Sequence, residues 1–197
     1  MCCPNDVVAV DKDKFYVTND HGTRGGIMRT LEDYLLIPWS YILYYNGQTF
    51  TKVRDGINYA NGINISNDHS KLYVACVTGR ELLSFKIKED GSLSLADRLN
   101  LKTGIDNIDV DEDGNLWIGA HPKLLAFVAH ADDSTKHSPS QALKLTPSGN
   151  SFAAEEIFLD DGKMISGSSV AVRYKNEVFV GVVFERKLLR MKLKNAE

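Results

Sequence analysis

The sequence predicts an all-β protein built from β-propeller blades, with one added helix. Short runs of β-branched and aromatic residues alternate with turn signals along almost the whole chain, as hairpins do. Two such units align well: INISNDHSKLYVA at 63–75 and IDVDEDGNLWIG at 108–119, with Tyr73 and Trp117 in matching places. Hairpin units that recur at the distance separating Tyr73 from Trp117 are the sequence signature of propeller blades.

Similar units stand at both ends of the chain. VVAVDKDKFYVTN at 7–19 places Tyr16 in the aromatic position, and SVAVRYKNEVFVG at 169–181 places Phe179 there. Four units can therefore be recognised, and the segments between them are expected to supply outer strands.

Two of these intervening segments are clear hairpins. Residues 41–45 and 49–53 flank Asn46-Gly47, and residues 81–87 and 93–101 flank the turn at 89–92. The polar segment 131–140 carries Pro139 and is expected to be an exposed loop.

Segment 22–38 has a different periodicity. Its apolar residues follow helical spacing, and Pro38 would end a helix there; they are Ile27, Met28, Leu31, Tyr34 and Leu35. The helix either caps the propeller or turns its apolar face to a lipid or lipoprotein surface. The predicted domain organisation is a single partial propeller over 1–197, with 22–38 as a helical insertion on its top.

Charge, hydropathy and cysteine spacing argue against three classes of function: nucleic-acid binding, membrane spanning and zinc binding. The formal net charge is −3 and there is no long basic run, so nucleic acid is not expected as a partner. No apolar run is long enough for a transmembrane helix, and the start MCCPNDVVAV reads directly into a strand, so we expect no signal peptide. Cys2, Cys3 and Cys76 show no zinc-like spacing with histidine.

Three polar motifs recur just before strand-like runs. They are Asn5-Asp6 before 7–10, Asn61-Gly62 before 63–65, and Asp106-Asn107 before 108–110; Ser168-Ser169 hold the same place in the last unit. In a propeller these positions lie at one rim of the central channel, where carboxylate and amide oxygens suit calcium. Asp6 could face a second cation deeper in the channel. The alternative is that these side chains only satisfy free backbone groups at strand entrances.

Two histidines follow strands at corresponding places. His21 comes after Asn19-Asp20 and His121 comes after Gly119-Ala120, and either could assist proton transfer near a cation-bound carbonyl. A loop histidine is more often a solvated side chain. His69, His130 and His137 are expected in turns or polar loops and receive no role.

Several of these motifs together resemble the paraoxonase/arylesterase family. The similarity runs in order through PNDVVAV, FYVTNDH, WSYILYY, YANGINIS, DNIDVD, LWIGAHP and GSSVAV. It implies a six-bladed β-propeller with two calcium ions and calcium-dependent hydrolysis of aryl esters and lactones, with looser activity on organophosphate esters. It also implies an extracellular or membrane-associated protein.

The resemblance assigns roles to individual residues. Asn5, Asn61, Asp106 and Asn107 match ligands of the catalytic calcium, and Asp6 matches a ligand of the structural calcium. Asp20, His21 and His121 match catalytic residues at or near the active-site cavity, and Tyr59 matches an aromatic residue of the substrate pocket. In the implied mechanism calcium polarises the ester carbonyl for attack by water.

The chain resembles roughly the C-terminal three-fifths of a paraoxonase. The upstream part of the family supplies further acidic ligands, a histidine pair and one cysteine of a disulfide. Three interpretations stay open: a fragment, which we favour, a component completed by another chain, or a non-catalytic relative that binds lipid or protein. A gluconolactonase-type propeller is a further alternative.

Overall fold

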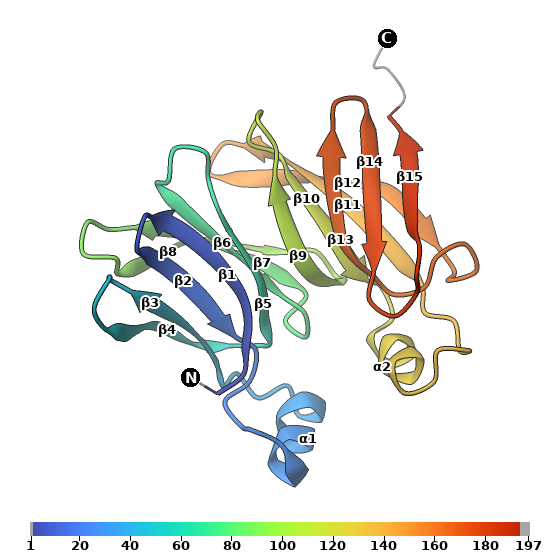
Figure 1. The fold of residues 1–197 in the computed structure, drawn as a ribbon, viewed down its shortest axis with the longest axis horizontal. Helices are drawn as coiled ribbons and strands as arrows, with labels where there is room; N and C mark the ends of the chain where they lie inside the picture. Colours follow the sequence, from blue (N-terminus) through green and yellow to red (C-terminus); the bar gives the residue numbers. More distant parts are fainter. Residues whose placement is uncertain (1, 194–197) are drawn as a thin grey trace. The chain divides into compact units, whose positions relative to one another are not determined.

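The computed structural model describes residues 2–193, which fall into two compact units, 1–100 and 101–197. Most of the described chain forms antiparallel strands, and two short helices lie between them (Figure 1). The prediction of one partial propeller domain over 1–197 stays a prediction, as does the placement of 22–38 on its top.

The first unit contains two four-stranded sheets. One has the order β1-β2-β3-β4 and the other β5-β6-β7-β8, so each strand pairs with its neighbour in sequence. Their bounds are β1 (Pro4–Asp11), β2 (Lys14–Asn19), β3 (Ser40–Tyr45), β4 (Phe50–Ile57), β5 (Ala60–Ile65), β6 (Lys71–Cys76), β7 (Glu81–Ile87) and β8 (Leu93–Asn100).

The second unit contains one four-stranded sheet and one three-stranded sheet. Their orders are β9-β10-β11-β12 and β13-β14-β15 (Figure 1). The strands are β9 (Gly104–Val110), β10 (Leu116–His121), β11 (Ser140–Ser148), β12 (Ser151–Asp160), β13 (Ser168–Tyr174), β14 (Glu177–Val182) and β15 (Leu188–Lys192).

These four antiparallel meanders confirm the predicted all-β fold of propeller blades. The aromatic residues that revealed the repeat all lie on the second strand of their sheet, opposite the first strand. The pairs are Tyr16 with Val8, Tyr73 with Asn64, Trp117 with Asp109, and Phe179 with Val172. The hairpins at Asn46-Gly47 and 89–92 are confirmed as well.

Each unit has its own apolar core. In the first, Tyr16, Ile42, Leu72, Val74 and Phe85 are almost fully buried and pack together. In the second, a smaller cluster surrounds a buried tryptophan; its members are Trp117, Ala142, Ile165, Ala171, Val178 and Val180. Both cores form from the alternate inward-facing residues of the strands.

The helix predicted over 22–38 is shorter than expected. Helix α1 (Gly26–Tyr34) begins after Gly25, whose φ of 152° is a glycine conformation, and Leu36 at φ 52° lies beyond its end. Its apolar residues point to solvent: Ile27 is 79% exposed and Tyr34 is 68% exposed, whereas Glu32 is 4% exposed. The inward face of α1 is therefore the polar one.

A second helix, α2 (Leu124–Asp132), was not predicted. Its sequence LLAFVAHAD is apolar nearly throughout, so it lacks the polar and apolar faces that reveal a surface helix. The expected loop at 131–140 is correspondingly shorter, because its first two residues belong to α2 and Ser140 begins β11. The placement of His130 in a turn or polar loop was wrong: it lies in α2 and is 1% exposed.

Neither helix in residues 2–193 combines the length and the hydrophobicity needed to cross a bilayer.

Candidate active site

The polar motif Asn5-Asp6 lies in a β-bulge, inside the first strand rather than before it. Pro4 pairs with Asn19 and Val7 pairs with Val17, so Asn5 and Asp6 together face the single residue Thr18. An extra residue in one strand breaks the strict alternation of side chains and redirects those of the bulge.

The other two motifs lie in equivalent bulges. Asn61 and Gly62 face only Ala75, because the flanking pairs are Ala60–Cys76 and Ile63–Val74. Asp106 and Asn107 face only Gly119, between the pairs Ile105–Ala120 and Ile108–Ile118. All candidate metal ligands therefore occupy the same kind of backbone distortion, at the start of the first strand of a sheet.

A buried threonine connects the first two bulges. The Thr18 hydroxyl donates to the Asn61 carbonyl oxygen at 2.6 Å and accepts from the Asp6 backbone N–H at 3.1 Å. The Asp6 carboxylate in turn accepts from the Ile63 N–H at 2.9 Å. Thr18 is fully buried, so these bonds fix the start of β1 relative to β5.

His21 lies between two carboxylates. Its Nδ1 is 2.7 Å from Asp20 Oδ1 and its Nε2 is 2.6 Å from Asp33 Oδ1, and the ring is 1% exposed. Burial would lower the pKa of His21, but the hydrogen bonds to the two carboxylates outweigh it and raise the pKa above its ordinary value. An imidazole that donates from both nitrogens is a proton donor rather than a free base.

Asp20 joins this histidine to the first motif. Asn5 Nδ2 donates to Asp20 Oδ2 at 3.2 Å, so the amide oxygen of Asn5 points away from that contact. Burial would raise the pKa of Asp20, yet the bonds from His21 and Asn5 outweigh it and lower the pKa below its ordinary value. Asp33, which reaches His21 from helix α1, was not among the residues predicted from sequence.

Tyr59 contacts the same histidine. Its ring packs edge-on against the His21 ring, with centroids 4.6 Å apart. Its backbone is left-handed at φ 52°, in the short turn between β4 and β5. The structure thus brings together four of the residues predicted from sequence, Asn5, Asp20, His21 and Tyr59.

In the second unit, Asp106 orients His121. His121 Nε2 lies 3.0 Å from Asp106 Oδ2, and the ring is 1% exposed. Because a carboxylate only accepts, Nε2 donates to it, and in the neutral ring Nδ1 then presents its lone pair. Within the described part of the chain, His121 Nδ1 is a buried atom with no hydrogen-bond partner. A carboxylate on one nitrogen and a free lone pair on the other is the arrangement of an oriented base.

Asn107 is held by its amide nitrogen, which donates to Asp106 Oδ1 at 3.3 Å and to the Ser169 carbonyl oxygen at 3.1 Å. Its amide oxygen is therefore left pointing away from both. Gly119, opposite the bulge, permits this approach: a Cβ there would lie 2.2 Å from the Val170 backbone nitrogen and 2.7 Å from the Ser169 oxygen.

An aromatic cluster beside His121 was missed by sequence reasoning. Phe127 of α2 stacks on the His121 ring with centroids 3.7 Å apart, and Phe184 lies 5.9 Å from Phe127. His130 meets Phe184 edge-on at 5.5 Å, and its Nδ1 donates to the Lys136 carbonyl oxygen. Only recognition of α2 as a helix could have placed Phe127 near His121.

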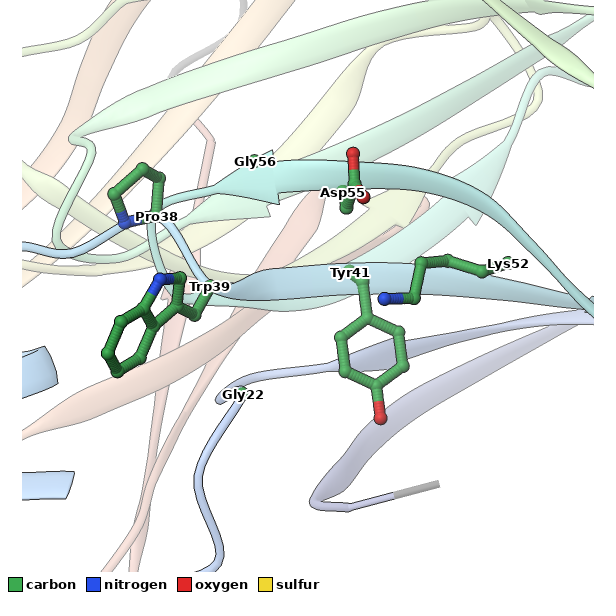
Figure 2. A pocket seen from close by; sticks show the side chains of 7 residues that line it. All are labelled: Gly22, Pro38, Trp39, Tyr41, Lys52, Asp55 and Gly56. Carbon is green, nitrogen blue, oxygen red and sulfur yellow. The ribbon is translucent and has the colours of Figure 1, made fainter. Parts of the chain in front are cut away.

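A separate pocket of about 440 Å³ lies in the first unit (Figure 2). Its lining comprises Gly22, Pro38, Trp39, Tyr41, Lys52, Asp55 and Gly56. Figure 2 shows the Lys52 side chain beside the Tyr41 ring, and the Lys52 Nζ atom is 4.7 Å from the ring centroid. None of the residues predicted to bind metal or substrate or to take part in catalysis lines this pocket.

The chemistry of the candidate ligands fits a hard cation. All five offer oxygen atoms, from the carboxylates of Asp6 and Asp106 and the amides of Asn5, Asn61 and Asn107. Among residues 2–193 no three His, Cys, Asp or Glu side chains cluster as a metal site would require, so the amides are needed in any such site.

Comparison with known proteins identifies the family. A family model described as Arylesterase matches residues 2–191. The chain belongs to the arylesterase family. Its relatives include serum paraoxonase/arylesterase 1 of Homo sapiens, 33% identical over 189 residues, and serum paraoxonase/arylesterase 2 of Gallus gallus, 35% identical over 190 residues. Both alignments cover 93% of this chain and 52% of the relative, so this arylesterase-family chain spans about half the length of the curated relatives it matches.

Solved structures with propeller folds resemble this arylesterase-family chain at lower identity. A calcium-binding regucalcin from Agrobacterium tumefaciens matches with a TM-score of 0.58 and 14% identity, over 93% of this chain and 54% of the other. A gluconolactonase from Xanthomonas campestris matches with a TM-score of 0.53 and 16% identity, over 91% and 54%. These likenesses confirm the propeller fold class.

Proposed function

We propose that this chain carries the greater part of the active site of a calcium-dependent hydrolase of carboxylic esters, with aryl esters and lactones as substrates and organophosphate esters as poorer ones. The observation that supports this most is the set of three β-bulges, each presenting amide or carboxylate oxygens at the same point of its blade. Membership of the arylesterase family supports the ester chemistry.

For the metal we propose the assignment that the family resemblance implies. Asn5, Asn61, Asp106 and Asn107 are the ligands of the catalytic calcium, and Asp6 is a ligand of a second, structural calcium. The oriented amides of Asn5 and Asn107 support this, because each donates through nitrogen and leaves its oxygen for a cation. The name of the regucalcin neighbour, a calcium-binding protein, agrees with the choice of metal.

Each unit offers a histidine that can assist proton transfer. In the second unit, His121 is oriented by Asp106 and can accept a proton at Nδ1. In the first unit, His21 is held between Asp20 and Asp33 and can donate a proton. Tyr59 packs on His21 and forms an apolar wall for the substrate. Calcium, when bound, would supply polarisation of the carbonyl and stabilisation of the negative oxygen.

Calcium-dependent thermal stabilisation tests the metal assignment without requiring turnover. A ligand that binds only the folded state raises the unfolding free energy as its concentration exceeds Kd, by about 2.7 kcal/mol at a hundredfold excess. Asn61→Ala and Asp106→Ala should lose most of the calcium-induced rise in Tm. Asp161→Ala, whose side chain is 61% exposed and pairs with Lys163, is the matched control. Unchanged calcium stabilisation in both site variants would refute the assignment.

The second candidate function is a propeller that binds lipid without catalysis. Helix α1 supports it, because Ile27, Met28, Leu31 and Tyr34 are exposed while the buried residue of the helix is Glu32. An exposed apolar helix face of this kind fits a lipid or lipoprotein surface, and it would place the protein outside the cell or at a membrane.

Vesicle sedimentation tests whether the exposed apolar face of α1 binds lipid. The wild-type chain should pellet with phosphatidylcholine vesicles, and the double variant Ile27→Ser, Leu31→Ser should stay in the supernatant. Val128→Ser, on the half-exposed face of α2, is the control. If vesicles leave both proteins in the supernatant, α1 has no lipid role.

A further inference from the structure

Cys2 and Cys3 hold their sulfur atoms close together just before β1. The two Sγ atoms are 3.1 Å apart, and both cysteines are free. In an extended segment, successive side chains point to opposite sides, which keeps neighbouring sulfurs well separated. The convergence of these two sulfurs is therefore a property of this particular segment.

Hydrogen bonds of the backbone fix this segment. The Cys2 N–H donates to Asn19 Oδ1 and to the Tyr41 hydroxyl, both at 3.1 Å. The Cys3 carbonyl oxygen accepts from the Asp20 N–H at 3.0 Å. Because β2, β3 and the residue after β2 each hold the pair, the two side chains are kept on one side of the chain.

The sulfur of Cys3 is also engaged by the segment leading to α1. It donates to the Thr23 carbonyl oxygen at 3.4 Å, and Arg29 NH1 lies 3.5 Å from it. A guanidinium at this distance stabilises negative charge on sulfur and disfavours a metal cation there. These contacts favour thiol chemistry over metal binding.

Solvent can reach the pair. Both cysteines are only half-buried, and two residues around them belong to the wall of the 440 Å³ pocket in Figure 2. Tyr41 bonds to Cys2, and Gly22 is adjacent to Thr23, the partner of Cys3. Cys76 differs, since it is fully buried.

We propose that Cys2 and Cys3 form a redox-modifiable dithiol, which a hydroperoxide converts reversibly into a vicinal disulfide. One sulfur attacks the peroxide oxygen, the O–O bond breaks, and a sulfenic acid and water or the corresponding alcohol form. The second sulfur then attacks the sulfenic sulfur, the S–O bond breaks, and its oxygen leaves as water. The two thiols together lose two protons and two electrons, and the peroxide takes up both to give water and water or the corresponding alcohol.

Proximity drives the second step. The two Sγ atoms are already 3.1 Å apart, so a sulfenic acid formed on one sulfur lies within reach of the other. The resulting bond should be easily reduced, because adjacent Cα atoms are about 3.8 Å apart whereas disulfides usually join Cα atoms 4.4–6.8 Å apart.

Mass spectrometry of the full-length chain tests the proposal. After treatment with hydrogen peroxide and iodoacetamide under native conditions, the peptide containing Cys2 and Cys3 should carry no label and weigh two hydrogens less. Dithiothreitol should restore two labels to it. Cys76, which is fully buried and should be labelled only after unfolding, serves as the internal control for a thiol that neither reagent reaches in the folded chain.

A variant separates the pair from two independent thiols. In Cys2→Ser, Cys3 should progress to sulfinic acid at the same peroxide concentration, because no second thiol traps its sulfenic acid. Sulfinic acid on both cysteines of the wild-type chain, full labelling after peroxide, or disulfide-linked dimers in place of the internal bond would each overturn the proposal.

Discussion

Asp111 is the residue whose replacement should most clearly destabilise the second unit. It lies in the turn that joins β9 to β10, the hairpin that carries Asp106 at its start and His121 at its end. Its Oδ1 accepts from the N–H groups of Asp113 at 3.0 Å and Asn115 at 2.9 Å. Its Oδ2 accepts from Trp117 Nε1 at 2.9 Å and from Arg173 NH1 at 3.2 Å.

Asp111→Asn keeps the shape of the side chain but replaces one carboxylate oxygen, an acceptor, with an NH₂ group, a donor. Asn115 Nδ2 bonds to both oxygens and can keep the one that remains, but whichever oxygen is lost, two other N–H groups then face an NH₂ group. Asp111 is only 8% exposed, so water cannot easily replace the acceptor. At about 1.5 kcal/mol for each hydrogen bond to a charged group, the loss is about 3 kcal/mol at pH 7. With a urea slope of about 1.5 kcal/mol/M, the midpoint should fall by about 2 M.

The difference in unfolding free energy between the wild type and Asp111→Asn should depend on pH. Burial would raise the pKa of Asp111, but the bonds from Trp117, Asn115 and Arg173 outweigh it and lower the pKa below its ordinary value. A group with a lowered folded-state pKa adds stability above its unfolded pKa, about 3.9, and that stability is lost as the pH falls through the folded value. The wild type and Asp111→Asn should therefore differ fully at pH 7 and converge below about pH 4.

The assay is urea unfolding followed by tryptophan fluorescence. The chain has two tryptophans, so a Trp39→Phe background leaves Trp117, a direct partner of Asp111, as the reporter. Asp113→Asn is the matched control: its side chain is 62% exposed and its ion pair with Arg173 should contribute less than about 1 kcal/mol. An Asp111→Asn midpoint within experimental error of the background, or equal effects of both variants, would refute the reasoning.

Three further substitutions test the bulges and helix α1. Gly119→Ala should displace the Ser169 carbonyl oxygen, destabilise the fold by about 1–3 kcal/mol and weaken the stabilisation by calcium. Thermal shift with and without calcium measures both effects, and wild-type values would contradict the close approach of the Ser169 backbone to Gly119. Thr18→Val removes the bonds of a buried hydroxyl to Asn61 and Asp6 and should cost about 1–3 kcal/mol in urea unfolding, while Thr30→Val should cost little. Glu32→Gln weakens the acceptor of the Gly22 and Thr23 N–H groups, so amide exchange of 22–34 should accelerate while that of 71–87 stays unchanged.

The strands were predictable from sequence because their signals are local. Alternating apolar residues and the turn glycines defined the hairpins, and β7 runs over the predicted residues 81–87. The bulges were not predictable, because one extra residue in a strand appears only when the partner strand is known. For that reason Asn61 and Asp106 were expected before strands and are found within them.

The candidate site was predicted in its residue types but not in its supporting contacts. The repeat and the family resemblance pointed to Asp20, His21 and His121. Asp33 and Phe127 were not predicted because both reach the histidines from helices. The helical spacing in 22–38 predicted a helix but not its contact with His21, and α2 has no amphipathic pattern that would reveal it. Long-range packing of this kind is decided by tertiary structure and not by local pattern.

The pairing of every described strand with its neighbour in sequence has a consequence for how the chain acquires its structure. Apart from the β2–β3 and β10–β11 connections, which contain α1 and α2, the sheets close short loops, so the entropy lost on forming these hairpins is modest and their contact order is low. Hairpins such as β9–β10 can form early, each within one contiguous stretch of chain. The candidate site residues at the ends of these hairpins then form their contacts with other sheets last. The site is therefore the part of the molecule most sensitive to incomplete folding.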